Sequence, residues 1–233
     1  GNKNIGIGAF AMQDNTTGFN NCAVGYSAME KCTTGENNSA FGTGALVNIT
    51  TGSNNTGVGK NSGLSLTTGS ANVVVGVEAM DANTSGLYNT AVGYAALTLQ
   101  TQNNGNSGFG YEAGEKITTG DFNTLLGYKA GYNLTQGTNS IAIGKEAAFP
   151  SAGADNNIIL GNSSIQHLRC QVSSIESLSD ERDKTDIVDM PIGLNFVNKL
   201  RPVKFKWNIR DAVSDNPHQG RVRGGFIAQE LKA

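Results

Sequence analysis

Asn89-Thr90-Ala91-Val92-Gly93 opens a 17-residue unit that recurs along residues 1–162. The glycine that closes this block returns every 17 residues, at Gly8, Gly25, Gly42, Gly59, Gly76, Gly93, Gly110, Gly127, Gly144 and Gly161. The asparagine keeps the same step from Asn4 to Asn123, slips by one place to Asn139, and returns at Asn157. A disordered linker rich in glycine, asparagine and threonine has no need of such a register, so the period predicts a repeat architecture.

Three further columns keep this period. A second glycine stands at Gly18, Gly35, Gly52, Gly69, Gly86, Gly120 and Gly137. A small residue stands at Ala11, Ala28, Ala45, Ser62, Ala79, Ala96, Ala113, Ala130 and Ala147. An apolar residue precedes the first glycine each time, at Ile7, Val24, Phe41, Val58, Val75, Val92, Phe109, Leu126, Ile143 and Leu160. We interpret the last set as an apolar column that forms the core of the module.

Each repeat predicts one coil of a parallel β-solenoid or β-roll, with about ten coils in all. The Asn89–Gly93 block alternates as a short strand with one buried face does. The rest of the unit, rich in threonine, glycine and asparagine, is typical of turns, where glycine and asparagine adopt positive φ at little cost. Coils stacked at about 4.8 Å would join the apolar positions into one core and the asparagines into amide ladders.

A single chain of this kind has a thin core and open strand edges. Packing an edge and the small-residue face against two sister chains would cover both. We therefore predict a mainly β protein that forms a homotrimer, with itself as its first partner.

The cysteines and tyrosines of the repeats are expected to have structural roles. Cys22 takes a strand position filled elsewhere by isoleucine, valine or threonine, so we expect a small core residue. Cys32 falls in the turn-side half of its coil, and a Cys22–Cys32 bridge is possible but not required. Tyrosines that follow the first glycine are expected to face outward, and we favour a packing ladder along the coils over a carbohydrate site; they are Tyr26, Tyr94, Tyr111 and Tyr128.

Composition excludes several function classes. The 233 residues are 38% hydrophobic and 15% charged, with a net charge of −2, which argues against binding of a nucleic-acid backbone. No apolar run is long enough for a transmembrane helix, so we expect no membrane insertion. His167 and His218 are too few and too far apart to predict a metal site, and nothing in the sequence predicts a cofactor. The start at Gly1, without methionine or an apolar leader, suggests a fragment or a processed product.

The repeats resemble the heads of trimeric autotransporter adhesins and similar repeats of phage tail fibres. This resemblance covers residues 1–162, with its asparagine placed before a hydrophobic-glycine pair. Residues 163–178 break the period, and their apolar residues fit either a short strand and turn or a heptad spacing. We interpret them as a neck that joins three chains and ends at a cleavage site.

Three blocks after the neck occur in a distinctive order. They are Ser179-Asp180-Glu181-Arg182-Asp183-Lys184, Arg201-Pro202-Val203-Lys204-Phe205 and Gly225-Phe226-Ile227-Ala228-Gln229-Glu230. Residues 179–233 thereby resemble the self-cleaving intramolecular chaperone at the C-terminus of phage tailspikes, tail fibres and endosialidases. The resemblance implies a small α+β module, of which this chain holds the N-terminal part, because the family continues past the last block to long helices. Asp183 departs from the leucine that many relatives carry.

The resemblance also implies a site. The scissile bond would be Leu178–Ser179, with Ser179 as nucleophile and Lys184 as its base. Asp180 and Arg182 match supporting positions and would orient the turn as a charged pair. A lysine can act as base only when part of it is neutral, and burial in an assembled trimer would lower its pKa enough. Any enzymatic activity would then be a single-turnover peptidase reaction on the chain itself.

These observations are compatible with three functions. The first is a structural virion protein, the trimeric shaft of a phage tail fibre or tailspike that attaches to a host receptor or glycan. The second is a trimeric adhesin on a bacterial surface with a similar chaperone. The third, a glycan-degrading spike enzyme, needs paired carboxylates facing a cleft, and the acids of the repeats occur irregularly in turns, so we rank it last.

Overall fold

The computed structural model describes residues 3–168 and the backbone of residues 203–206 and 222–225. Two compact units divide the chain, Gly1–Arg169 and Cys170–Ala233. The first holds the repeats, and the second holds a two-stranded antiparallel pair.

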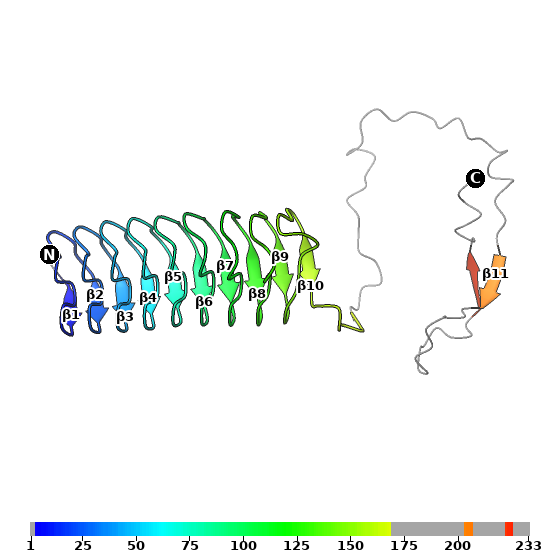
Figure 1. The fold of residues 1–233 in the computed structure, drawn as a ribbon, viewed down its shortest axis with the longest axis horizontal. Helices are drawn as coiled ribbons and strands as arrows, with labels where there is room; N and C mark the ends of the chain where they lie inside the picture. Colours follow the sequence, from blue (N-terminus) through cyan, green and yellow to red (C-terminus); the bar gives the residue numbers. More distant parts are fainter. Residues whose placement is uncertain (1–2, 169–202, 207–221, 226–233) are drawn as a thin grey trace, which may run out of the picture. The chain divides into compact units, whose positions relative to one another are not determined.

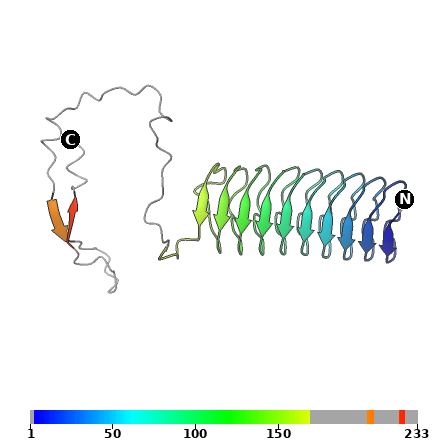
Figure 2. The ribbon, with the colours of Figure 1, turned by 180° about the vertical axis from the view of Figure 1, so that it is seen from behind.

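The first unit is a parallel β-solenoid (Figures 1 and 2). Its ten three-residue strands are β1 (Ile5–Ile7), β2 (Cys22–Val24), β3 (Ser39–Phe41), β4 (Thr56–Val58), β5 (Val73–Val75), β6 (Thr90–Val92), β7 (Ser107–Phe109), β8 (Thr124–Leu126), β9 (Ile141–Ile143) and β10 (Ile158–Leu160). They form one sheet in sequence order, and each strand residue pairs with the residue 17 places later, as Thr90 pairs with Ser107. The solenoid predicted from the period is confirmed, with nine turns joining ten strands and no helix among the described residues.

Hydrogen bonding between coils is not confined to the strands. Beside β1 and β2, the Ile5 N–H donates to the Asn21 carbonyl at 2.9 Å and the Gly25 N–H donates to the Ile7 carbonyl at 2.8 Å. In the turn segments, the Met29 N–H donates to the Ala45 carbonyl at 3.0 Å. Each coil therefore meets its neighbour around much of its circumference, which requires coils of equal length.

The apolar column predicted as core does not face the interior. Its members are exposed or half-buried, from Val24 and Val92 to Ile7 at 59% exposure. Side chains alternate along a strand, so only the middle residue of each three-residue strand points inward. The middle residues are small in most coils, such as Gly57 and Ala91, because the interior of the coil is narrow. The interpretation of the column as core was therefore wrong.

The real core is supplied mainly by the segments predicted as turns. Its large members are Met29, Leu46, Ile49, Leu66, Met80, Leu97, Ile117, Leu125 and Leu134, all fully buried. They pack with the alanine column, of which Ala28 to Ala147 are buried. Small strand residues and large turn residues of neighbouring coils are complementary in size. A Cβ added at Gly57 would lie 2.7 Å from Leu46 Cγ, and one added at Gly108 would lie 2.8 Å from Leu97 Cγ. A glycine in one strand thus leaves room for a leucine of the preceding turn.

The two glycine columns share one constraint, because an added Cβ in either column would collide with the backbone of the next coil, and the first column has a second constraint in its φ angle. The first column has positive φ, for example 143° at Gly25 and 134° at Gly93, a region that side chains disfavour. The second column lacks positive φ, so there only the collision with the backbone carbonyl of the next coil excludes a Cβ, as at Gly52 and Gly120. The positive-φ explanation therefore holds for the first column and not for the second. Asn20, Asn37 and Asn54 take positive φ as expected of asparagine.

The asparagine column forms the expected amide ladder. Asn72 Nδ2 donates to Asn55 Oδ1 at 3.1 Å and to the Gly86 carbonyl at 2.8 Å. Asn72 Oδ1 in turn accepts the backbone N–H of Asn89 at 2.9 Å. Both ends of this buried amide are used, so each asparagine ties its coil to the coils on either side.

We predict that Gly120→Ala destabilises the solenoid by about 2 kcal/mol, because the new methyl group meets a backbone carbonyl that cannot yield without moving a coil. Gly153→Ala is the matched control, since nothing lies within 4 Å of its added Cβ. Thermal unfolding followed by circular dichroism measures both. Equal midpoints for the two variants would contradict the close-approach explanation.

We predict that Asn72→Ala lowers stability by about 2–3 kcal/mol, because it leaves the Asn89 N–H and the Gly86 carbonyl buried without partners. Gln102→Ala removes an exposed amide and should leave the unfolding midpoint unchanged. Denaturant unfolding of both variants checks the difference. A midpoint for Asn72→Ala equal to that of the parent would show that the ladder does not stabilise the fold.

Candidate functional site

The predicted self-cleavage residues lie outside the described residues. This holds for Leu178 and Ser179 at the proposed scissile bond and for Asp180, Arg182 and Lys184. Most of the neck at 163–178 lies there as well, and residues 163–168 form no strand. The roles of these residues stay predictions.

Two strands are described in the C-terminal unit. β11 (Val203–Lys206) pairs antiparallel with β12 (Val222–Gly225), and Phe205 lies opposite Arg223. β11 overlaps the second of the three sequence blocks, Arg201-Pro202-Val203-Lys204-Phe205. β12 was not predicted, because its sequence Val-Arg-Gly-Gly has too few apolar residues to alternate. The expected α+β character of this unit lies outside the described residues.

The outer face of the solenoid sheet carries an uncovered apolar row. We define this apolar row as the last residue of each strand: Ile7, Val24, Phe41, Val58, Val75, Val92, Phe109, Leu126, Ile143 and Leu160. The first residues of the strands run beside it and include isoleucine, valine, cysteine, serine and threonine, with no charged residue in either row. A contiguous exposed apolar surface of this kind is typical of an interface.

Cys22 belongs to the outer face and not to the core. It is the half-buried first residue of β2, so the prediction of a small core residue was wrong for the same reason as for the apolar row. Cys32 is the buried cysteine, in the column that holds Ile49 and Leu66. Burial raises the pKa of the Cys32 thiol. Both cysteines are free, so the possible bridge between them is not formed.

Three tyrosines stack along the outside of neighbouring coils, as predicted. Tyr94 and Tyr111 lie 5.2 Å apart between ring centroids at 14°, and Tyr111 and Tyr128 lie 5.3 Å apart at 10°. Tyr26 is not part of this stack and meets Phe10 edge to face. The rings cover one another's faces, so the stack presents ring edges and hydroxyl groups outward. The expected packing ladder is confirmed for three of the four tyrosines.

An ion pair runs beside the tyrosine stack. Lys129 Nζ lies 2.9 Å from Glu112 Oε2 and 5.7 Å from the centre of the Tyr128 ring. Hydrogen bonds from Lys129 and Tyr111 hold the pKa of Glu112 below its usual value. The pair is therefore formed at neutral pH, and its contribution is lost as the pH falls through that lowered pKa.

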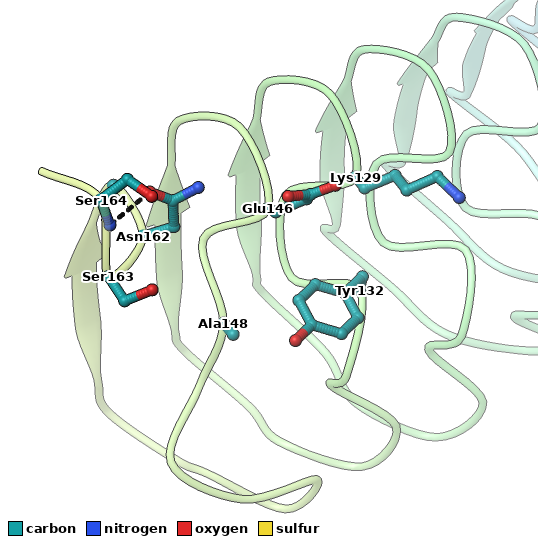
Figure 3. Close-up of a pocket in the computed structure, with 8 residues that line it drawn as sticks. Lys129, Tyr132, Glu146, Ala148, Asn162, Ser163 and Ser164 are labelled. Carbon is teal, nitrogen blue, oxygen red and sulfur yellow. Dashed lines mark hydrogen bonds between the residues drawn. The ribbon is translucent and has the colours of Figure 1, made fainter.

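A hollow of about 730 Å³ opens at the C-terminal end of the solenoid (Figure 3). Its lining residues come from the last three coils and are Lys129, Tyr132, Glu146, Ala148, Gly161, Asn162, Ser163 and Ser164. Figure 3 shows the Tyr132 ring along one wall and Asn162, Ser163 and Ser164 at the opposite end. Aromatic, carboxylate, amide and hydroxyl groups therefore surround one open space.

The described part of the chain holds neither a metal-binding cluster nor a membrane-spanning helix. Over these residues, no group of three histidine, cysteine, aspartate or glutamate side chains is placed to hold a metal ion. In the same part of the chain, no helix has the length and apolar character needed to span a bilayer.

Residues 179–233 match the family described as chaperone of endosialidase. This match defines the chaperone-of-endosialidase segment, which makes up the last part of the chain. No curated protein and no solved structure matches the chain. The resemblance drawn from the three sequence blocks is thus confirmed, and β11 and β12 are the described strands of this chaperone segment. The match begins at Ser179, the residue that the resemblance marks as nucleophile.

Proposed function

We propose that this chain is the shaft of a phage tail fibre or tailspike, a trimeric virion component that attaches to a host cell surface. One observation carries the proposal: a chaperone-of-endosialidase segment follows a parallel solenoid whose outer strands carry an uncovered apolar row. A chaperone is useful where folding waits for contacts between chains, because slow non-local pairing leaves apolar surface open to aggregation.

The apolar row supports the trimer. Phe41, Phe109 and Leu126 are 43%, 38% and 48% exposed, and no described segment covers them. Three copies arranged around a common axis would bury the row along the full length of the solenoid, as closed cyclic symmetry allows. Burial of exposed apolar surface is the main favourable term in such an association.

Maturation would proceed by cleavage of the Leu178–Ser179 bond. Neutral Lys184 accepts the proton of the Ser179 hydroxyl, and the oxygen attacks the Leu178 carbonyl carbon. The amide C–N bond breaks, the Ser179 nitrogen takes up a proton, and an ester links Leu178 to the serine oxygen. Water hydrolyses the ester and releases a shaft that ends at Leu178. Asp180 and Arg182 hold the turn as a charged pair.

We predict that Ser179→Ala yields an uncut chain, because the nucleophile is absent. Lys184→Arg should also stay uncut, since arginine keeps the charge but does not become neutral in a protein. Intact mass of each purified protein identifies the product. Cleavage at Leu178 in the parent and in neither variant supports the mechanism, whereas cleavage in Ser179→Ala contradicts it.

We predict that Phe109→Lys prevents trimer formation, because it places a charge in the apolar row. Leu99→Lys is the matched control, since Leu99 is 46% exposed and lies outside the row. Native mass spectrometry reads the oligomeric state, and circular dichroism verifies that both variants are folded. A trimer that tolerates Phe109→Lys, or a monomeric parent, would exclude the apolar row as the interface.

A further inference from the structure

The repeat changes its backbone where the hollow at the C-terminal end opens. In the eight preceding coils, the residue equivalent to Ala148 has positive φ, whether it is Met29, Leu97 or Gly131. Ala148 does not. Pro150 restricts Phe149 to extended conformations, and Phe149 turns into the core with 3% of its surface exposed. The chain is thereby withdrawn from the surface beside Tyr132.

This altered turn is held in place by a pair of hydrogen bonds. Asn133 Nδ2 donates to the Phe149 carbonyl at 2.7 Å, and Asn133 Oδ1 accepts the Phe149 N–H at 3.0 Å. The hollow is therefore a fixed feature of the last coils. A local departure from an otherwise strict repeat is where a function is expected, because the fold alone does not require it.

The lining offers a flat apolar wall with both donors and acceptors around it. Tyr132 is 40% exposed and presents its ring to the open space (Figure 3). Asn162 Oδ1 accepts the Ser164 N–H at 3.0 Å, which fixes the side chain and leaves Nδ2 as a donor. Glu146 supplies an acceptor, and the hydroxyl groups of Ser163 and Tyr132 do both. Ligand sites commonly combine aromatic walls with a few fixed polar groups in about 300–1,000 Å³.

The charged groups of the lining disfavour binding of an anionic ligand. Lys129 contributes its stem, but its ammonium group points away from the hollow (Figure 3) and pairs with Glu112 at 2.9 Å. Lys145 is 3.8 Å from Glu146 and mostly exposed, and it does not line the hollow. The carboxylate of Glu146 is thus a lining charge without a cation directed into the space. A ligand rich in hydroxyl groups, each able to donate and to accept, matches this set better than a phosphate or an acidic sugar.

We propose that this hollow binds neutral sugar units of a host-surface polysaccharide. A sugar ring would lie with its C–H groups against Tyr132 and direct hydroxyl groups to Glu146 and Asn162. The volume of about 730 Å³ exceeds that of one sugar unit, so a short oligosaccharide should bind more tightly than a monosaccharide. This inference rests on the proposed attachment function and names the chemistry of its receptor.

Saturation-transfer NMR on the purified full chain tests the proposal. The probes are maltotriose, cellotriose, triacetylchitotriose and lactose, with sialyllactose as the anionic counterpart of lactose. We expect transfer to at least one neutral probe, and titration should show binding about tenfold or more weaker in Tyr132→Ala and in Asn162→Ala. Tyr88→Ala is the control, since Tyr88 is 69% exposed but lies far along the chain in another coil.

The possible outcomes distinguish failure of the sugar-binding proposal from failure of the proposed shaft function. Absence of transfer to every neutral probe, preference for sialyllactose over lactose, or equal loss in Tyr132→Ala and Tyr88→Ala would each overturn the proposal. Native and intact mass of the same samples report trimerisation and cleavage independently. A monomeric chain that still binds a neutral sugar through Tyr132 would leave the site in place while removing the proposed trimeric shaft, and an uncut trimer would remove only the proposed maturation step.

Discussion

The distance between neighbouring coils is the constraint on which the rest of the structure depends. Hydrogen bonds link coil to coil in the strands and in the turn segments, as between Met29 and Ala45. Once the coils are this close, the second glycine column has no room for a side chain, and Asn72 can reach both neighbours with one amide. The same closeness narrows the interior, so Gly57 and Ala91 occupy it while larger apolar residues of the strands face outward.

The sequence predicted the architecture well because every coil of a parallel solenoid has the same length, so equivalent residues recur at a constant spacing in the sequence. Ten glycines in register predicted ten strands, and the asparagine column predicted its own ladder. The inside and outside of the strand could not be told apart in the same way. In a three-residue strand, the first and last side chains point outward and the middle one points inward. The last position is the more apolar one, so the pattern alone favours it as core, which is the wrong face. The sequence did not predict Leu46 and Leu97 as core residues, because the residues around them are typical of turns.

The two candidate sites also differ in how far the sequence predicts them. The chaperone segment was recognisable from blocks of residues in a fixed order, although Ser179 and Lys184 lie outside the described residues. The hollow had no sequence signal of this kind. Pro150 marks its position, but that a proline would redirect Phe149 inward and uncover Tyr132 depends on packing between coils. Its polar groups come from three successive coils, which only the stacked structure brings together.

Because the coils are equal, the length of the solenoid can change without a change in its cross-section. Because nearly every 17-residue coil carries its own glycine contact and its own ladder asparagine, a coil gained or lost would leave the cross-section of the solenoid unchanged. An insertion of any other size would have to bulge out of its coil as a loop if the later hydrogen bonds are to stay in register. Evolution can therefore adjust the reach of such a solenoid in whole steps by duplicating or deleting repeats, while the last coils and their hollow are carried unchanged at one end.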